Sequence, residues 1–142
     1  MLEYGRQLGA DFLARLKSGK PIVIELLGDV GAGKTTLTRG IAEGLGVAAL
    51  VTSPSFTISK CYAFPLGKSE GNLVHYDFYR LPDPGLMSED LDENLNAPNM
   101  VVILEWANSV EGILPEDRIK VEIKYLDDGG REIKIEGIQK EA

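Results

Sequence analysis

The string GDVGAGKT at residues 28–35 constrains the fold of this chain more than any other part of its sequence. It fits the pattern G-x-x-x-x-G-K-[S/T], which indicates a phosphate-binding loop only where it lies between a strand and a helix. The preceding residues 21–27, PIVIELL, have the length and β-branched content of a buried strand. Leu37, Ile41 and Leu45 follow at helical spacing, and glycines end that pattern. The string therefore lies in the context that the pattern requires.

Each residue type in this string suits the binding of a polyphosphate. Backbone N–H groups of a loop that opens into a helix converge on phosphate oxygens, and the helix dipole favours the negative charge. Glycines allow close approach, Lys34 would reach the β- and γ-phosphates, and the Thr35 hydroxyl would join the shell of Mg²⁺. The residues expected to contact a nucleotide are Gly28, Asp29, Gly31, Ala32, Gly33, Lys34, Thr35 and Thr36. The alternative is a glycine-rich hairpin or helix cap with an incidental lysine, but a random chain of this length would contain the string only about once in 200 cases.

Two carboxylates follow apolar segments elsewhere in the chain. Glu105 ends the run NMVVILE at 99–105, and Asp77 follows LVHY at 73–76. In an open α/β sheet, ligands lie beyond the carboxyl ends of the strands. Phosphoryl transfer to water needs an ion that neutralises charge and a group that orients the water. We therefore expect Asp77 and Glu105 to act in catalysis with Lys34, with a structural salt bridge as the alternative for Glu105.

The remaining pattern predicts a three-layer α/β domain of the P-loop NTPase type that spans residues 1–142, with a mixed parallel and antiparallel sheet. The run 99–105 is typical of a strand covered on both faces, and such a strand lies centrally in a sheet. The other predicted elements are a helix at 8–16, strands at 55–63 and 72–76, a helical stretch at 86–95, and a hairpin formed by 119–125 and 133–135 around a DDGG turn.

Composition and charge make several classes of protein improbable. No apolar run reaches the roughly 18 residues of a membrane span. No secretory signal is visible, and the lone Cys61 fits a reducing, cytoplasmic compartment. Fifteen basic and 22 acidic residues give a net charge of −7, so tight direct binding of nucleic acid is not expected. Residues 72–142 hold 7 basic and 16 acidic groups, which could form solvated surface or meet a basic partner.

Four strings together make the chain resemble the TsaE (YjeE) family. They are GDVGAGKTTLTRG at 28–40, SPSFT at 53–57, HYDFYRL at 75–81 and EW at 105–106. The resemblance covers most of the chain and is far more specific than the first string alone. It implies a bacterial P-loop ATPase of tRNA threonylcarbamoyladenosine biosynthesis that assembles with the TsaB and TsaD proteins. The threonylcarbamoyl group goes to the adenosine beside the anticodon of tRNAs that read ANN codons, and this transfer belongs to TsaD.

The resemblance also assigns roles by position, with ATP and Mg²⁺ as the bound groups. It implies that Thr35 and Glu105 hold Mg²⁺ and that Asp77 acts at the γ-phosphate or its water. Arg131 is implied to touch the nucleotide. Gly5 stands near the place where a family threonine often contacts the nucleotide, so this chain departs from the family there.

Several interpretations remain open at this point. A small-molecule kinase would use the same phosphate-binding loop, and a non-enzymatic protein would use the nucleotide only to stabilise one conformation for partner binding. Arg80 could stabilise charge at the γ-phosphate, or it could pair with Asp77 or with an acid of a partner. His75 is interpreted as a hydrogen-bonding residue of the core or its rim. Trp106 is expected to pack beside Glu105.

Overall fold

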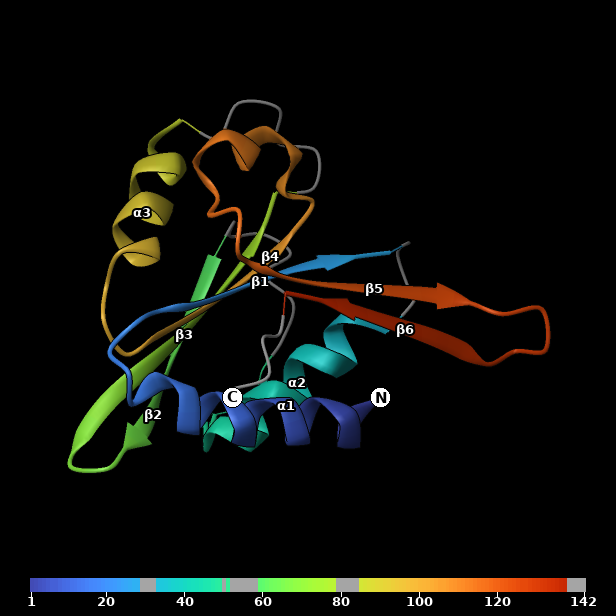
Figure 1. Ribbon diagram of the computed structural model, residues 1–142, viewed down its shortest axis with the longest axis horizontal. Coiled ribbons are helices and arrows are strands. Elements are labelled where there is room, and N and C mark those ends of the chain that lie inside the picture. The colour runs from blue at the N-terminus through green and yellow to red at the C-terminus, as the bar shows by residue number, and fades with distance from the viewer. Residues whose placement is uncertain (29–32, 50, 52–58, 79–84, 138–142) are drawn as a thin grey trace.

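The computed structural model describes residues 1–28, 33–49, 51, 59–78 and 85–137 (Figure 1). Its elements are, in chain order, α1 (Leu2–Leu16), β1 (Ile22–Leu27), α2 (Lys34–Leu45), β2 (Ser59–Leu66), β3 (Ser69–Asp77), α3 (Leu86–Leu95), β4 (Met100–Glu105), the 3₁₀ helix η1 (Ala107–Ile113), β5 (Ile119–Tyr125) and β6 (Arg131–Glu136). No helix in the described part of the chain is long and apolar enough to cross a lipid bilayer.

The six strands form one mixed sheet in the order β2-β3-β4-β1-β5-β6. The four inner strands β3, β4, β1 and β5 run parallel, and the edge strands β2 and β6 are each antiparallel to their neighbour. Parallel neighbours need a crossover that covers a face of the sheet, and α3 supplies one between β3 and β4. The predicted mixed α/β architecture is confirmed.

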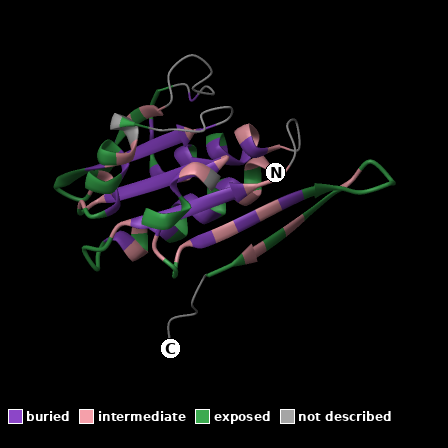
Figure 2. Cartoon of the chain, turned by 90° about the horizontal axis from the view of Figure 1, so that it is seen from above, coloured by how far each residue is buried: buried purple, intermediate pink, exposed green. Residues whose placement is uncertain are grey.

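Helices cover both faces of the sheet and make three layers. Helices α1 and α2 lie on one face, and α3 and η1 lie on the other (Figure 1). Strands β1 and β4 are almost entirely buried, whereas the far end of the β5–β6 hairpin extends beyond the helices and is exposed (Figure 2). All six residues of β4 are buried, because this strand has neighbours on both sides and helices on both faces. The predicted central position of 99–105 is thereby explained.

Strands β2 and β3 form a hairpin that the sequence pattern did not reveal. The strands predicted at 55–63 and 72–76 are both part of it, and a turn at residues 67–68 joins them. Pro65 weakens the strand signal of β2, yet a proline is tolerated in an edge strand because only one side of the strand bonds to a neighbour. The part of the predicted strand before Ser59 lies outside the described residues.

Four glycines let α1 and α2 cross at very short range. They lie in two pairs, Gly5 against Gly40 and Gly9 against Gly44. A Cβ atom added to Gly5 would approach the carbonyl oxygen of Leu37 to 2.6 Å, and one added to any of the other three would also meet backbone of the facing helix. Gly5, at which this chain departs from the family resemblance, therefore serves helix packing.

A buried tyrosine ties α3 to the sheet. The Tyr76 hydroxyl donates to the carboxylate of Asp90 at 2.5 Å and accepts from the amide of Asn94 at 2.6 Å. Its ring stacks on that of Phe78, with 5.6 Å between the centroids. Burial, followed by the hydrogen bond to Asp90, raises the pKa of Tyr76 above its ordinary range. The phenol is therefore neutral and holds α3 through hydrogen bonds.

We expect Tyr76→Phe to lower the free energy of unfolding by about 1–2 kcal/mol near neutral pH, because two hydrogen bonds are lost. The raised pKa also makes the wild type lose stability above about pH 10, where an unfolded tyrosine ionises and the folded one does not. Urea unfolding at neutral and alkaline pH tests both points. The difference in stability between wild type and variant should shrink as the pH rises, and a constant difference would contradict this origin.

Candidate functional site

Lys34 is the first residue of α2 and turns its side chain back toward the end of β1. Gly33 caps the helix with φ at 110°, a left-handed value that glycine adopts without strain. The Lys34 side chain is buried, and its Nζ donates to the backbone oxygen of Gly28 at 2.8 Å. The ammonium group is thus held where β1 ends and α2 begins, as the motif predicts.

The two predicted carboxylates lie on neighbouring strands at the same end of the sheet. Strands β3 and β4 are parallel and in register, so that Asp77 is directly opposite Glu105. Glu105 is also opposite Leu26 of β1, which ends beside the lysine. Side chains alternate between the two faces of a strand, so this register places Asp77 and Glu105 on one face. Ile103, which shares that face, belongs to the core under α1 and α2.

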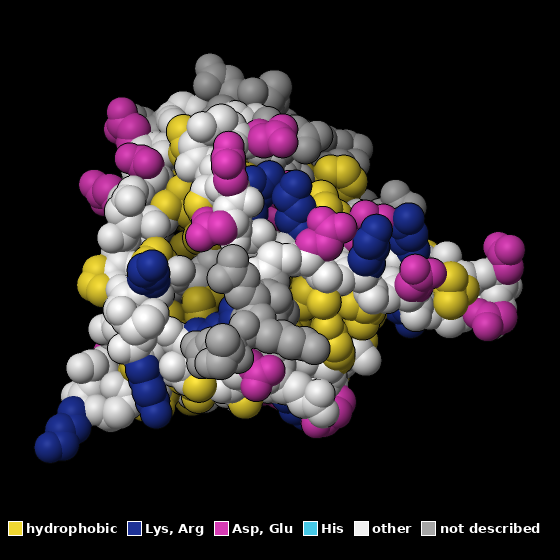
Figure 3. All heavy atoms as spheres, in the orientation of Figure 1, with side chains coloured by type: hydrophobic (Ala, Val, Ile, Leu, Met, Phe, Trp, Pro, Cys, Tyr) yellow, Lys and Arg dark blue, Asp and Glu magenta, His cyan; other side chains and the backbone are white. Residues whose placement is uncertain are grey.

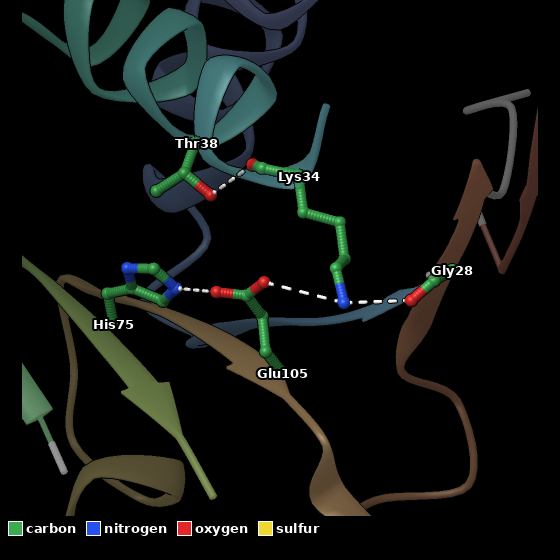
Figure 4. Close-up of polar contacts among 5 residues, drawn as sticks. All are labelled: Gly28, Lys34, Thr38, His75 and Glu105. Carbon is green, nitrogen blue, oxygen red and sulfur yellow. Dashed lines mark hydrogen bonds and ion pairs between the residues drawn. The ribbon is translucent and has the colours of Figure 1, made fainter. Parts of the chain in front are cut away.

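A chain of polar contacts joins the ends of β1, β3 and β4 (Figure 4). Lys34 Nζ lies 3.7 Å from Oε1 of Glu105, and Oε2 of the same carboxylate lies 2.6 Å from Nε2 of His75. All three side chains are buried. Above them, the hydroxyl of Thr38 donates to the backbone oxygen of Lys34 at 2.9 Å. The ion pair places the lysine beside the glutamate, and the imidazole contacts the other carboxylate oxygen.

Trp106 does more than pack against its neighbours. Lys34 Nζ lies 4.4 Å from the centroid of its ring, within the range of a cation–π interaction. The Trp106 backbone has φ at 55°, a left-handed value that is unusual for a residue other than glycine. Such strain concentrates at functional sites, where the surrounding structure maintains it. Here it turns the chain sharply from the end of β4 into η1.

The described glycines of the motif both have positive φ and close neighbours. A Cβ atom on Gly28 would approach the backbone oxygen of Ile123 to 2.5 Å. One on Gly33 would lie 3.6 Å from Nε of Arg131 and 3.3 Å from a side-chain carbon of Met1. Arg131, implied only by the family resemblance, is therefore brought beside the motif by the β5–β6 hairpin. Its guanidinium stacks on Tyr125.

Some residues that we singled out cannot be placed. Asp29, Gly31 and Ala32 lie outside the described residues, as do Arg80 and the segment 53–57. Thr35 and Thr36 are placed, half-buried in the first turn of α2. Asp77 is half-buried and has interactions of its own.

The described residues fit a phosphate group. No side chain among them caps the start of α2, and its first turn carries no acid, so the N–H groups there are available to an anion. Lys34 and Arg131 add positive charge beside these groups. The oxygens of Thr35, Asp77 and Glu105 are the donors that Mg²⁺ prefers. Since Mg²⁺ beside a nucleotide needs only one or two carboxylates, this donor set fits that ion as well.

Sequence reasoning missed the partners of these groups. His75 was interpreted only as a hydrogen-bonding residue, and the structure assigns its partner as Glu105. The motif HYD does carry a signal, because His75 and Asp77 must share a face of their strand. That signal becomes specific only when β4 is known to be the neighbour of β3.

A cavity of about 330 Å³ lies at the opposite end of the sheet, where β1 and β5 begin. Its lining includes Arg118, whose Nε donates to Oε1 of Glu25 at 2.9 Å with both side chains buried. The Arg118 cation is thus neutralised within the chain. Ligands of open α/β sheets lie beyond the carboxyl ends of the strands. In this sheet that end is the one at Lys34, so the cavity lies at the opposite end.

Comparison with known proteins decides the family. The family model described as threonylcarbamoyl adenosine biosynthesis protein TsaE matches residues 2–133. This chain belongs to the TsaE family. A relative from Haemophilus influenzae, named tRNA threonylcarbamoyladenosine biosynthesis protein TsaE, is 39% identical over 128 residues, which cover 90% of this chain and 78% of the relative. A relative of the same name from Bacillus subtilis is 43% identical over 120 residues, or 82% of this chain and 70% of the relative.

A solved structure agrees with this assignment. The crystal structure of YdiB from Bacillus subtilis superimposes with a TM-score of 0.66 at 36% sequence identity. The match covers 94% of this chain and 78% of that one. The TsaE family resemblance and the α/β fold that the sequence predicted are thereby confirmed.

Proposed function

We propose that this TsaE-family chain is a Mg²⁺-dependent ATPase that supports formation of the threonylcarbamoyl group on the adenosine beside the anticodon of tRNAs reading ANN codons. One observation carries the proposal. The buried ammonium of Lys34 lies at the start of α2 and faces Glu105 at the end of β4, with Asp77 opposite that glutamate. A cation, a helix N-terminus and two carboxylates meet there, and these are the groups that bind and hydrolyse a nucleoside triphosphate.

The phosphate-binding residues act by position and charge. Lys34 would leave its contacts with Gly28 and Glu105 for the β- and γ-phosphates, where its charge offsets that of the triphosphate. The N–H groups of the motif, including those of Gly33, Thr35 and Thr36, would bind the phosphate oxygens. Arg131 would reach the nucleotide from the β5–β6 hairpin, since it already lies beside Gly33.

The carboxylates divide the remaining work. Thr35 and Glu105 would hold Mg²⁺, which when bound neutralises charge on the phosphates and on the leaving oxygen. Asp77 would accept a hydrogen bond from the attacking water and so orient it toward the γ-phosphate. The register that places Asp77 opposite Glu105 supports this division, because the metal and the water would then lie at the same end of the sheet, beyond the carboxyl ends of β3 and β4.

The chemistry on the tRNA belongs to partners in this proposal. The chain would assemble with TsaB and TsaD, and its turnover of ATP would permit repeated cycles of transfer by TsaD. This role places the chain in the cytoplasm, with neither a membrane nor a tightly bound nucleic acid as its direct partner. The exposed acidic residues of α3 contribute to a negative surface that would repel a phosphate backbone (Figure 3).

Phosphate release from ATP and Mg²⁺ tests this function. We expect slow release by the chain alone and faster release when the TsaB–TsaD pair is added, because the partners are the proposed users of the energy. Equal release with and without the pair would refute the coupling. Nucleotide-dependent association with the pair and no phosphate release would instead favour the non-enzymatic binding protein.

A further inference from the structure

His75 is the only histidine of the chain, and the function proposed above gives it no part. Its side chain is 1% exposed, and Nε2 lies 2.6 Å from Oε2 of Glu105. Its other ring nitrogen, Nδ1, is buried and has no hydrogen-bond partner among the described residues. A buried polar atom without a hydrogen-bond partner lowers stability, so the role of a histidine at this position needs an explanation.

The strand register explains how His75 reaches Glu105. His75 of β3 is opposite Ile103 of β4, and Glu105 is two residues further along the same strand. Side chains alternate, so His75, Ile103 and Glu105 all point to the face covered by α2. The imidazole spans the diagonal between the two strands and approaches the carboxylate from the side opposite Lys34 (Figure 4).

The contact has a defined direction. We take Glu105 as an ionised carboxylate, whose oxygens only accept hydrogen bonds, and therefore assign the hydrogen of this contact to Nε2 of His75, which donates it. This donation occupies Oε2 of Glu105 and turns Oε1 toward Lys34, 3.7 Å away. Without the imidazole, the glutamate side chain would be free to take other rotamers at the strand end.

We infer that His75 is a positioning residue, which holds Oε2 of Glu105 by a hydrogen bond so that Oε1 faces the phosphate-binding lysine and the metal proposed beside it. The inference rests on the proposed function, because it takes Glu105 to be the metal-binding carboxylate. Groups that hold a metal ligand in this way matter for affinity, and their removal costs metal sites roughly 10- to 100-fold. In this role His75 itself would touch neither nucleotide nor metal.

Three substitutions separate this role from simple packing. His75→Gln keeps an amide donor near the place of Nε2, His75→Asn carries its amide too far back to reach Glu105, and His75→Leu has no donor. The measurement is the binding of a non-hydrolysable ATP analogue, followed by the fluorescence of Trp106, the only tryptophan. Each protein is titrated once in EDTA and once in saturating Mg²⁺. The ratio of the two affinities gives the contribution of the metal.

We expect the affinity in EDTA to be the same in all four proteins. The gain in affinity from Mg²⁺ should fall about 10- to 100-fold in His75→Leu and His75→Asn and should be largely restored in His75→Gln. Leu73→Ala is the matched control, because Leu73 is a buried residue on the same face of β3 with no polar contact to Glu105. It should lower stability and leave the gain from Mg²⁺ unchanged.

The outcomes distinguish this inference from the proposed function. If the wild type does not bind the analogue, the proposed function fails. If the wild type binds it with a gain from Mg²⁺ and His75→Leu shows the same gain, only the positioning role fails. The positioning role would also be overturned if His75→Gln and His75→Asn lost the gain in affinity from Mg²⁺ equally, or if Leu73→Ala lost it. If His75→Leu does not fold, the comparison of His75→Gln with His75→Asn still tests the positioning role.

A second measurement needs no nucleotide. Because the chain has one imidazole, its ¹⁵N signals are assigned without ambiguity. We expect a protonated Nε2 and a bare Nδ1 in the wild type, and a change of both signals in Glu105→Ala. A hydrogen on Nδ1 with none on Nε2 would exclude donation to Glu105 and overturn the inference.

Discussion

Replacing Lys34 by alanine is expected to abolish ATP hydrolysis, with a loss of more than about 100-fold. Among the described residues, the Lys34 ammonium is the one buried positive charge at the start of α2, and its hydrogen bond to Gly28 directs it toward the end of β1. No other described group could replace it between that backbone oxygen and Glu105. Nucleotide affinity should also fall, because the charge would contact the β- and γ-phosphates. Phosphate release and the binding of an ATP analogue measure the two effects.

The fold should survive this change. Among the described residues, Lys34 makes one hydrogen bond, one long ion pair and a contact with the Trp106 ring, and Glu105 keeps its bond to His75 in the variant. Lys20→Ala, which removes an exposed lysine at the far end of β1, is the matched control and should hydrolyse ATP like the wild type. The fluorescence emission of Trp106 should change in Lys34→Ala and not in Lys20→Ala, because only the former removes the cation that lies over the Trp106 ring. Hydrolysis at the wild-type rate in Lys34→Ala would remove the basis of the proposed function.

Replacing Gly44 by alanine is expected to destabilise the protein by about 3 kcal/mol or more, at the upper end of the cost of overpacking. On an exposed helix the same change would be favourable, because alanine is the better helix former by about 1 kcal/mol. Here the new Cβ would meet the backbone oxygen of Arg6, and it would lie 3.0 Å from the backbone nitrogen of Ala10. Backbone atoms cannot rotate away as side chains do, so α1 and α2 would have to separate.

Urea unfolding of Gly44→Ala against Gly112→Ala tests this expectation. Gly112 lies in η1, has no atom within 4 Å of an added Cβ and does not need a positive φ, so its substitution should be nearly neutral. A Gly44→Ala protein as stable as the wild type would show that the two helices can move apart at little cost. Loss of stability should also weaken nucleotide binding, because α2 carries Lys34 at its first turn.

Local sequence determined the strand before Lys34 and the helix that begins with it. A β-branched run, a glycine-rich turn and a helical repeat are written in neighbouring residues, and each follows from backbone preferences and side-chain spacing. The central position of β4 was predictable for a similar reason, since a strand covered on both faces must be apolar throughout. The β5–β6 hairpin was visible in its alternation and its DDGG turn. Lys34, Asp77 and Glu105 of the candidate site could be proposed from the sequence because a motif and the ends of strands are local features.

Only the tertiary structure decided which of these residues meet. The contact of His75 with Glu105 depends on β3 and β4 being neighbours in one particular register, and a shift by one residue would turn the imidazole to the other face. The position of Trp106 over Lys34 depends on a left-handed turn after β4, which the residue type disfavours. The crossing of α1 over α2 depends on glycines 35 residues apart facing one another. Such pairings join distant parts of the chain, and residue spacing along one segment carries no information about the segment it will face.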